Sequence, residues 1–329
     1  MSPYQPWQPG GVRVQLGDLT FDSTIPCGNG HDFREVGEGH VRFRAHVGRA
    51  NYAWRYYLRM DSPGDGREVL LEVPDLNHFG QKLWQEQATV TSTDGVTWTD
   101  VGLDRMAIVP HTPTGVPELD DTADDGWHPP YGVQVRLRLD SPTLYLATPT
   151  PYTPAHSRDH LHALARRCEF FHVEEIGRSR HYDSHGFPLL MCRVTKGGDA
   201  SERLRVFVVA GEHPSESAGM YAAEGLLEEL LRTHDLLADF DFWVVPIVNA
   251  DGVVFGKSCH HVAPDPADVG VNLARDWIDR TQPETQAVWR VLEQVQPHCV
   301  LSLHNGRHRR EYEAWAPHHP GLATMMDAL

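Results

Sequence analysis

The stretch LRVFVVAGEHPSESAGMYAAEGLLEELLRT, residues 204–233, predicts a strand, a short turn and a helix in direct succession. Residues 204–210 are almost continuously apolar, which is typical of a strand that is buried on both faces. Residues 217–233 have the composition and spacing of an amphipathic helix. The turn between them carries His213 and Glu216, although plain turn residues would suffice there. We therefore expect a βα unit with metal-competent side chains at the end of its strand.

Around this unit, apolar strands alternate with helices from about residue 157 onward. The other expected strands are 170–176, 188–194, 242–248 and 299–304, and the other expected helices are 157–167 and 283–295. Near-continuous apolar strands that alternate with helices predict an α/β domain whose sheet is covered on both faces.

The chain before this region has the period-2 alternation of β structure. In HVRFRAHV, residues 40–47, apolar side chains alternate with Arg and His, and residues 52–60, 67–73 and 131–140 behave similarly. Asp94-Gly95 separates two runs rich in Thr, Val and Trp, which indicates a hairpin over 88–101. The loop 110–130 is rich in Pro and Asp and is expected to be exposed. This pattern predicts a β-sandwich.

The prolines of ATPTPYTPAHS, residues 147–157, interrupt regular structure and mark a domain boundary. The sequence therefore predicts an N-terminal β-sandwich domain over residues 1–148 and an α/β domain over 149–329. We expect the sandwich to shape the entrance to a site in the second domain rather than to perform chemistry.

Charge and composition limit the function. The formal net charge is −16, with 29 Lys and Arg against 45 Asp and Glu, which disfavours nucleic acid and anionic membranes as partners. The N-terminus resembles no signal peptide, and no apolar run has transmembrane length. The five cysteines include no C-x-x-C pair and predict neither a disulfide framework nor a thiolate metal site. We expect a cytoplasmic protein.

Three side chains at the ends of two expected strands form a candidate metal site. His213 and Glu216 follow the strand 204–210, and His304 ends the strand 299–304. Two histidines and a glutamate with an open fourth position are a ligand set of catalytic zinc. The alternative is purely structural, with Glu216 stabilising a helix N-terminus and His213 in a turn beside Pro214. The recurrence of a histidine after a second strand favours the metal.

An ordered series of segments resembles the carboxypeptidase A clan of zinc metallocarboxypeptidases, and in particular its cytosolic carboxypeptidase branch, in which a β-sandwich precedes the peptidase domain. The matching segments are the Pro-Tyr junction in LYLATPTPYTPAHSRDHLHAL, GEHPSESAG, VVPIVNADGVVFG, GVNLARDW, PETQAV and LSLHN. The resemblance implies one zinc ion, held by His213, Glu216 and His304. It also implies the C-terminus of a peptide or protein as the substrate.

The resemblance also implies roles for residues that contact the substrate. Arg275 corresponds to the arginine that holds the substrate's terminal carboxylate, but Ala274 replaces the family's neighbouring asparagine. Cys259 stands near the position of a second arginine, which polarises the scissile carbonyl in the family. Lys257, two residues earlier, is a candidate substitute for it.

The family's general-base glutamate is not found. That residue lies well beyond the last zinc ligand in the family, whereas this sequence continues from residue 304 only to 329. Glu311 and Glu313 lie in REYEAWAP, which is predicted to be the next strand rather than the catalytic segment. We therefore expect the C-terminal part of the peptidase domain to be missing and the activity of this chain to be in doubt.

Two other functions remain open. A zinc-dependent deacylase of N-acyl amino acids would use a similar ligand set, although in those enzymes the additional domain follows the zinc domain. A non-catalytic binding protein on a decayed peptidase scaffold is favoured by Cys259, Ala274 and the missing glutamate. Comparing turnover of peptides with turnover of N-acyl amino acids distinguishes the two enzymes. A continuation of the coding DNA beyond codon 329 that carries a glutamate on a strand would favour the enzyme over the binding protein.

Overall fold

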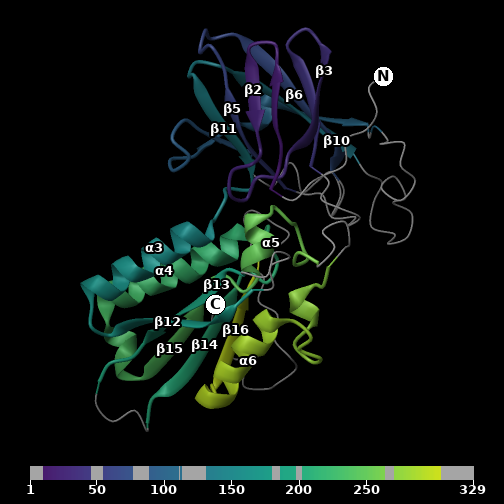
Figure 1. Ribbon diagram of the computed structural model, residues 1–329. Helices are drawn as coiled ribbons and strands as arrows, with labels where there is room; N and C mark the ends of the chain where they lie inside the picture. The colour runs from purple at the N-terminus through teal and green to yellow at the C-terminus, as the bar shows by residue number, and fades with distance from the viewer. Residues whose placement is uncertain are drawn as a thin grey trace.

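The computed structural model describes residues 10–45, 55–76, 89–110, 112, 131–179, 186–197, 202–263 and 270–304. Glu311, Glu313 and residues 113–130 of the predicted loop lie outside the described residues. Two parts are seen, an all-β part from the first half of the chain and an α/β part from the second (Figure 1). Both predicted fold classes are therefore confirmed. No helix of the described residues combines the length and the apolar character needed to cross a membrane.

The all-β part is a sandwich of two sheets. The first sheet has the order β1-β2-β5-β11-β7-β8, and its strands are β1 (Arg13–Leu16), β2 (Leu19–Asp22), β5 (Tyr56–Asp61), β11 (Thr143–Thr148), β7 (Val90–Ser92) and β8 (Thr99–Asp100). The second sheet has the order β3-β4-β6-β10-β9, and its strands are β3 (His31–Gly37), β4 (His40–Arg44), β6 (Glu68–Leu76), β10 (Tyr131–Arg138) and β9 (Met106–Pro110). A 3₁₀ turn, η1 (Leu103–Arg105), precedes β9.

The inward residues of both sheets share one apolar core. Phe21 and Leu58 from the first sheet pack in the same cluster as Phe43 and Leu71 from the second, and all four are fully buried. The predicted hairpin over 88–101 is present as the antiparallel pair β7 and β8. In its turn the Asp94 carboxylate accepts hydrogen bonds from the amides of Val96 and Thr97, at 2.8 and 2.7 Å.

The α/β part is built on a mixed sheet with the order β12-β13-β15-β14-β16. Its strands are β12 (Phe171–Arg178), β13 (Pro188–Val194), β15 (Phe240–Val245), β14 (Leu204–Ala210) and β16 (Cys299–Leu303). Its helices and 3₁₀ turns are α3 (Pro154–Arg167), α4 (Ser217–Thr233), η2 (Asp235–Ala238), α5 (Ala250–Val254), η3 (Leu273–Arg275) and α6 (Pro283–Val295). The strand β14 runs parallel to both of its neighbours, β15 and β16.

Both faces of this sheet are covered, as its continuous apolar strands predict. Val208 and Ala210 of β14 pack in one core with Met220 and Leu227 of α4. The alternate residues Phe207 and Val209 pack on the other face, in a cluster that includes Val288 of α6. Figure 1 shows α3 and α4 on one side of the sheet and α6 on the other.

The two parts meet near the sequence position of the expected boundary. The strand β11 belongs to the sandwich and ends at Thr148, and α3 begins at Pro154, where the Thr153 side chain caps it by accepting from the His156 amide. The helix therefore begins three residues before the expected 157. The division at residue 148 stays a prediction.

Candidate metal centre

The first two candidate ligands lie where β14 passes into α4. Gly211 follows the strand with a φ of +65°, and a Cβ there would lie 2.9 Å from the Cε of Met220, so the chain turns tightly under the helix. The Glu216 amide donates to the carbonyl of His213 at 3.1 Å, and α4 begins at the next residue. This one-turn hydrogen bond brings the side chains of His213 and Glu216 to the same end of the sheet.

The third candidate ligand arrives on the neighbouring strand. In the parallel pair β14 and β16, Ala210 is in register with Leu303, so His304 emerges at the same sheet edge as His213. Gly219 allows this approach, because a Cβ on it would lie 2.4 Å from the carbonyl oxygen of Leu303. Parallel register thus joins ligands that are 88 residues apart in the sequence.

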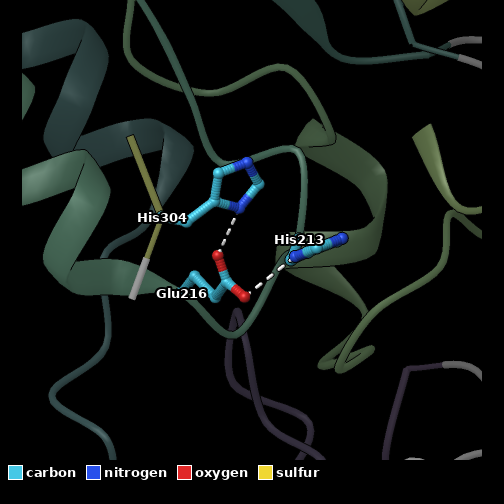
Figure 2. A group of neighbouring side chains, drawn as sticks. All are labelled: His213, Glu216 and His304. Carbon is cyan, nitrogen blue, oxygen red and sulfur yellow. Dashed lines mark hydrogen bonds and ion pairs between the residues drawn. The ribbon is translucent and has the colours of Figure 1, made fainter. Parts of the chain in front are cut away.

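The three side chains converge on one point. Figure 2 shows the Glu216 carboxylate between the two rings, with its Oε1 2.8 Å from His213 Nδ1 and its Oε2 2.7 Å from His304 Nδ1. One ligand atom from each residue lies within 4.8 Å of the others. Glu216 is buried at 7% exposure, whereas the His304 side chain is 34% exposed, so one side of the cluster faces solvent. The predicted trio is therefore assembled, with an open side.

The outer nitrogens of both rings are held by acceptors. His213 Nε2 donates to Asn272 Oδ1 at 3.2 Å. His304 Nε2 lies 3.2 Å from Glu212 Oε2 and 2.9 Å from Ser302 Oγ. Glu212 is itself buried, and its Oε1 accepts from Trp277 Nε1 at 2.6 Å. These acceptors favour a proton on each Nε2, so each Nδ1 is the atom that binds a metal once its own proton is displaced.

The Glu216 carboxylate and the two histidine rings shift one another's pKa. Burial alone would raise the pKa of Glu216, but hydrogen bonds from His213 and His304 outweigh it and lower this pKa to about 2. Burial lowers the pKa of His213, but hydrogen bonding to Cys259 and Glu216 outweighs it and raises this pKa to about 10. The hydrogen bonds to Glu212 and Glu216 raise the pKa of His304 to about 9. A carboxylate is thus held between two imidazolium rings.

These residues fit a zinc ion. Two imidazole Nδ1 atoms and a carboxylate are the donor types that zinc takes in catalytic sites, and they must converge because a Zn–N bond is only about 2.0–2.1 Å. Acceptors already hold the outer nitrogens, as is usual for histidine ligands. Within the described parts of the chain, His213, Glu216 and His304 are the one group of this kind.

Sequence reasoning missed Glu212 and Asn272 as partners of the ligands. Glu212 directly precedes His213, and Asn272 lies in the segment GVNLARDW, whose resemblance to the family concerns its overall pattern. A carboxylate next to a candidate ligand was an available signal. Nothing local indicated that it serves His304 rather than His213.

The predicted substrate-contacting residues differ in exposure. Arg275 is exposed at the end of η3, where its amide donates to the Asn272 carbonyl at 3.0 Å, and its guanidinium makes no hydrogen bond or ion pair with any residue in the described ranges. Cys259 lies behind His213, where its Sγ accepts from Asn272 Nδ2 at 3.2 Å. Lys257 is 1% exposed, so it can meet a substrate only if the surrounding loops open. The roles of Arg275 and Lys257 stay predictions.

The Glu212→Gln protein should bind zinc about 10- to 100-fold more weakly than the wild type, because the substitution removes the charge of an outer partner of His304. Competition with a chromophoric chelator measures this change. Glu224→Gln is the matched control, since Glu224 of α4 also contacts a histidine, His156 of α3 at 2.8 Å, but lies outside the cluster. Equal affinities of the two variants would contradict the role of Glu212.

Comparison with known proteins agrees with this geometry. Residues 158–312 match the family described as zinc carboxypeptidase. The metallo-carboxypeptidase from Burkholderia cenocepacia superposes with a TM-score of 0.68 at 21% identity, covering 89% of this chain and 72% of that one. The metallo-carboxypeptidase from Pseudomonas aeruginosa, solved in complex with (2-guanidinoethylmercapto)succinic acid, superposes with a TM-score of 0.65 at 20% identity, covering 88% and 70%. No curated protein matches the sequence.

The solved structures establish a shared fold, and the family match covers both ligand-bearing strand ends, at residues 213–216 and at 304. The α/β part of this chain is therefore similar to the zinc carboxypeptidase family over residues 158–312.

Proposed function

We propose that the protein is a zinc-dependent carboxypeptidase that hydrolyses the C-terminal peptide bond of peptides or proteins. The observation that carries this proposal is the convergence of His213, Glu216 and His304 at one sheet edge, with their ligand atoms within 4.8 Å of one another. The ligand set leaves a coordination position for water or substrate, as catalytic zinc requires.

Each residue has a distinct task in this proposal. His213, Glu216 and His304 hold one zinc ion, and Asn272 and Glu212 orient the two rings. When bound, zinc lowers the pKa of a water molecule and polarises a carbonyl group. Arg275 binds the terminal carboxylate of the substrate, since a guanidinium can hold a carboxylate through two parallel hydrogen bonds. No general base is assigned, and Glu311 and Glu313 lie outside the described residues.

The finer assignments belong to the same proposal. We place the protein in the cytosolic carboxypeptidase branch because a β-sandwich precedes the zinc domain, and we propose a cytoplasmic location. The Pseudomonas protein binds (2-guanidinoethylmercapto)succinic acid, whose succinic acid part has two carboxyl groups. That compound is therefore a suitable competitive probe for the carboxylate site proposed here.

The direct test is release of the C-terminal residue from a peptide by zinc-loaded protein. We expect release from a peptide with a free C-terminus and none from its C-terminally amidated form, because Arg275 needs a carboxylate. A chelator should abolish release and zinc should restore it. Turnover of N-acyl amino acids without turnover of peptides would replace the proposal with the deacylase.

A specific observation supports a second candidate, a non-catalytic binding protein. Cys259, near the position of the family's carbonyl-polarising arginine, hydrogen bonds to Asn272 behind the ligands, and a neutral thiol is a weak stabiliser of an oxyanion. Stoichiometric zinc and peptide binding without turnover would favour this candidate.

Arg275→Gln should raise the KM for a free-carboxylate peptide by at least about tenfold, because a charged hydrogen bond to a carboxylate contributes about 1.5–3 kcal/mol. Its zinc affinity should not change, since Arg275 contacts none of the ligands. Arg290→Gln is the matched control, because Arg290 is also exposed but lies on α6. An unchanged KM for Arg275→Gln would remove Arg275 from the substrate site.

A further inference from the structure

A buried arginine of the sandwich reaches the loop that carries the first two ligands. Arg55 directly precedes β5 and is 5% exposed. Among the described residues it has no acidic partner, and its guanidinium instead donates to backbone carbonyls. Burial of a guanidinium without a carboxylate is costly, so its three carbonyl contacts must offset that cost.

These carbonyls belong to three separate segments. Arg55 Nη1 donates to the Pro214 carbonyl at 3.0 Å and lies 3.5 Å from the Lys257 carbonyl, and Nη2 donates to the Cys27 carbonyl at 3.1 Å. Pro214 stands between His213 and Glu216 in the ligand loop. A side chain of the sandwich thus hydrogen bonds to the backbone between His213 and Glu216, two of the proposed zinc ligands.

Two of the segments that Arg55 contacts, the ligand loop and residues 257–258, are also hydrogen bonded to each other. The Ser215 hydroxyl donates to the Ser258 carbonyl at 2.7 Å, and the Ser215 amide donates to the same oxygen at 3.2 Å. These hydrogen bonds join the ligand loop to the 257–258 segment, and Arg55 contacts both. A shift of Arg55 would change the position of the whole unit.

Buried hydrogen bonds hold the backbone at Arg55 and at Tyr57. Asn29, which is fully buried, donates to the Arg55 carbonyl at 2.7 Å, and its Oδ1 accepts from the Tyr57 amide at 2.9 Å. The adjacent Cys27 amide donates to the Val254 carbonyl of α5 at 2.8 Å. Gly256 follows α5, and a Cβ there would lie 2.6 Å from the Asn29 Cβ. In Figure 1, α5 lies at the sandwich end of the α/β part.

We propose that Arg55 is a positioning residue of the metal centre, through which the β-sandwich holds the His213–Glu216 loop in its ligand-binding conformation. This inference rests on the proposed function, and it extends the sandwich's role beyond shaping an entrance. Arginine suits the task because its planar guanidinium offers several fixed donors to three carbonyls at once, whereas the lysine ammonium is a compact point charge.

The test compares zinc affinity in Arg55→Lys and Arg55→Gln with the wild type, using chelator competition on protein shown to be folded by circular dichroism. We expect about a 10- to 100-fold weaker zinc affinity for Arg55→Gln, the range typical of lost outer partners, and a smaller loss for Arg55→Lys. Hydrogen exchange in the metal-free proteins should be faster in residues 212–217 of the variants.

Arg44→Lys is the matched control. Arg44 is a buried arginine of the same sandwich, 6% exposed, but it pairs with Asp32 and Asp75 rather than with the ligand loop. This variant should lose thermal stability without losing zinc affinity. Gly256→Ala probes the same contact from the other side and should also weaken zinc binding, because its Cβ meets Asn29.

The outcomes separate the two proposals. If the wild type binds no zinc, the proposed function fails. If the wild type binds zinc and folded Arg55→Lys and Gly256→Ala both keep its affinity and its exchange rates in residues 212–217, the positioning role of Arg55 is overturned while the zinc site stands. A loss of affinity in Arg44→Lys equal to that in Arg55→Lys would also overturn it, because the effect would then reflect general destabilisation.

Discussion

The Glu216→Gln protein is expected to be purified without stoichiometric zinc. Glutamine keeps the size of the side chain but removes the negative charge that both His213 and His304 contact, at 2.8 and 2.7 Å. The loss should exceed the 10- to 100-fold typical of an outer partner, because an ion ligand itself is removed. Metal analysis of the purified protein and chelator competition measure the change.

A control on α4, the helix that follows Glu216, separates the effect of the candidate ligand from that of its surroundings. Glu229→Gln changes an exposed residue of α4 that pairs with Arg232, far along the helix from Glu216. This variant should bind one zinc ion as the wild type does. Stoichiometric zinc at wild-type affinity in Glu216→Gln would refute the proposed ligand set.

The second large effect is a steep dependence of zinc affinity on pH. The pKa of His213 is raised to about 10 and that of His304 to about 9, so both rings hold an extra proton at neutral pH in the metal-free protein. Zinc needs the lone pair that this proton occupies, so each zinc ion must displace two protons. Glu216, with a pKa of about 2, is already ionised and releases none.

Zinc and protons compete for the same imidazole nitrogens, and this competition sets the direction in which zinc affinity changes with pH. Affinity should fall as pH falls and should rise by about a hundredfold per pH unit between about pH 6 and 8. Rings with the ordinary histidine pKa of about 6.5 would instead give a dependence that levels off above that value. Titration calorimetry in buffers of different ionisation enthalpy counts the protons released.

Glu212→Gln provides the control for this slope. The hydrogen bond to Glu212 is the largest cause of the raised pKa of His304, so the variant should release fewer protons near pH 8. A pH-independent affinity in the wild type over about pH 7–8 would contradict the raised pKa of both rings.

Much of the fold could be predicted from the sequence, because apolar runs and helical spacing are local signals. The strands β13 and β14 and the helices α4 and α6 have the expected bounds, since apolar runs and helical spacing were uninterrupted there. The strand expected over 242–248 instead ends at Val245 and begins at Phe240. Pro246 follows its last residue, and proline lacks the amide that a strand needs for pairing.

Short elements could not be predicted from the sequence. The helix α5 has only five residues, one of them Gly252, and its sequence has no helical period to detect. It forms where the Asn249 side chain accepts from the Gly252 amide at 3.1 Å and where the sandwich packs on its end through Cys27. Both supports depend on the folded surroundings rather than on helix propensity.

The sequence by itself determined the two fold classes, because strand and helix periodicity are local, and it predicted the candidate ligand trio, because His213, Glu216 and His304 follow recognisable strand ends. Only the tertiary structure decided which residues support that trio. Asn272 is 59 positions from His213, and Arg55 is 159 positions from Pro214. Contacts at such separations leave no periodic trace in the chain, since they arise from the register of parallel strands and from the packing of one domain against another.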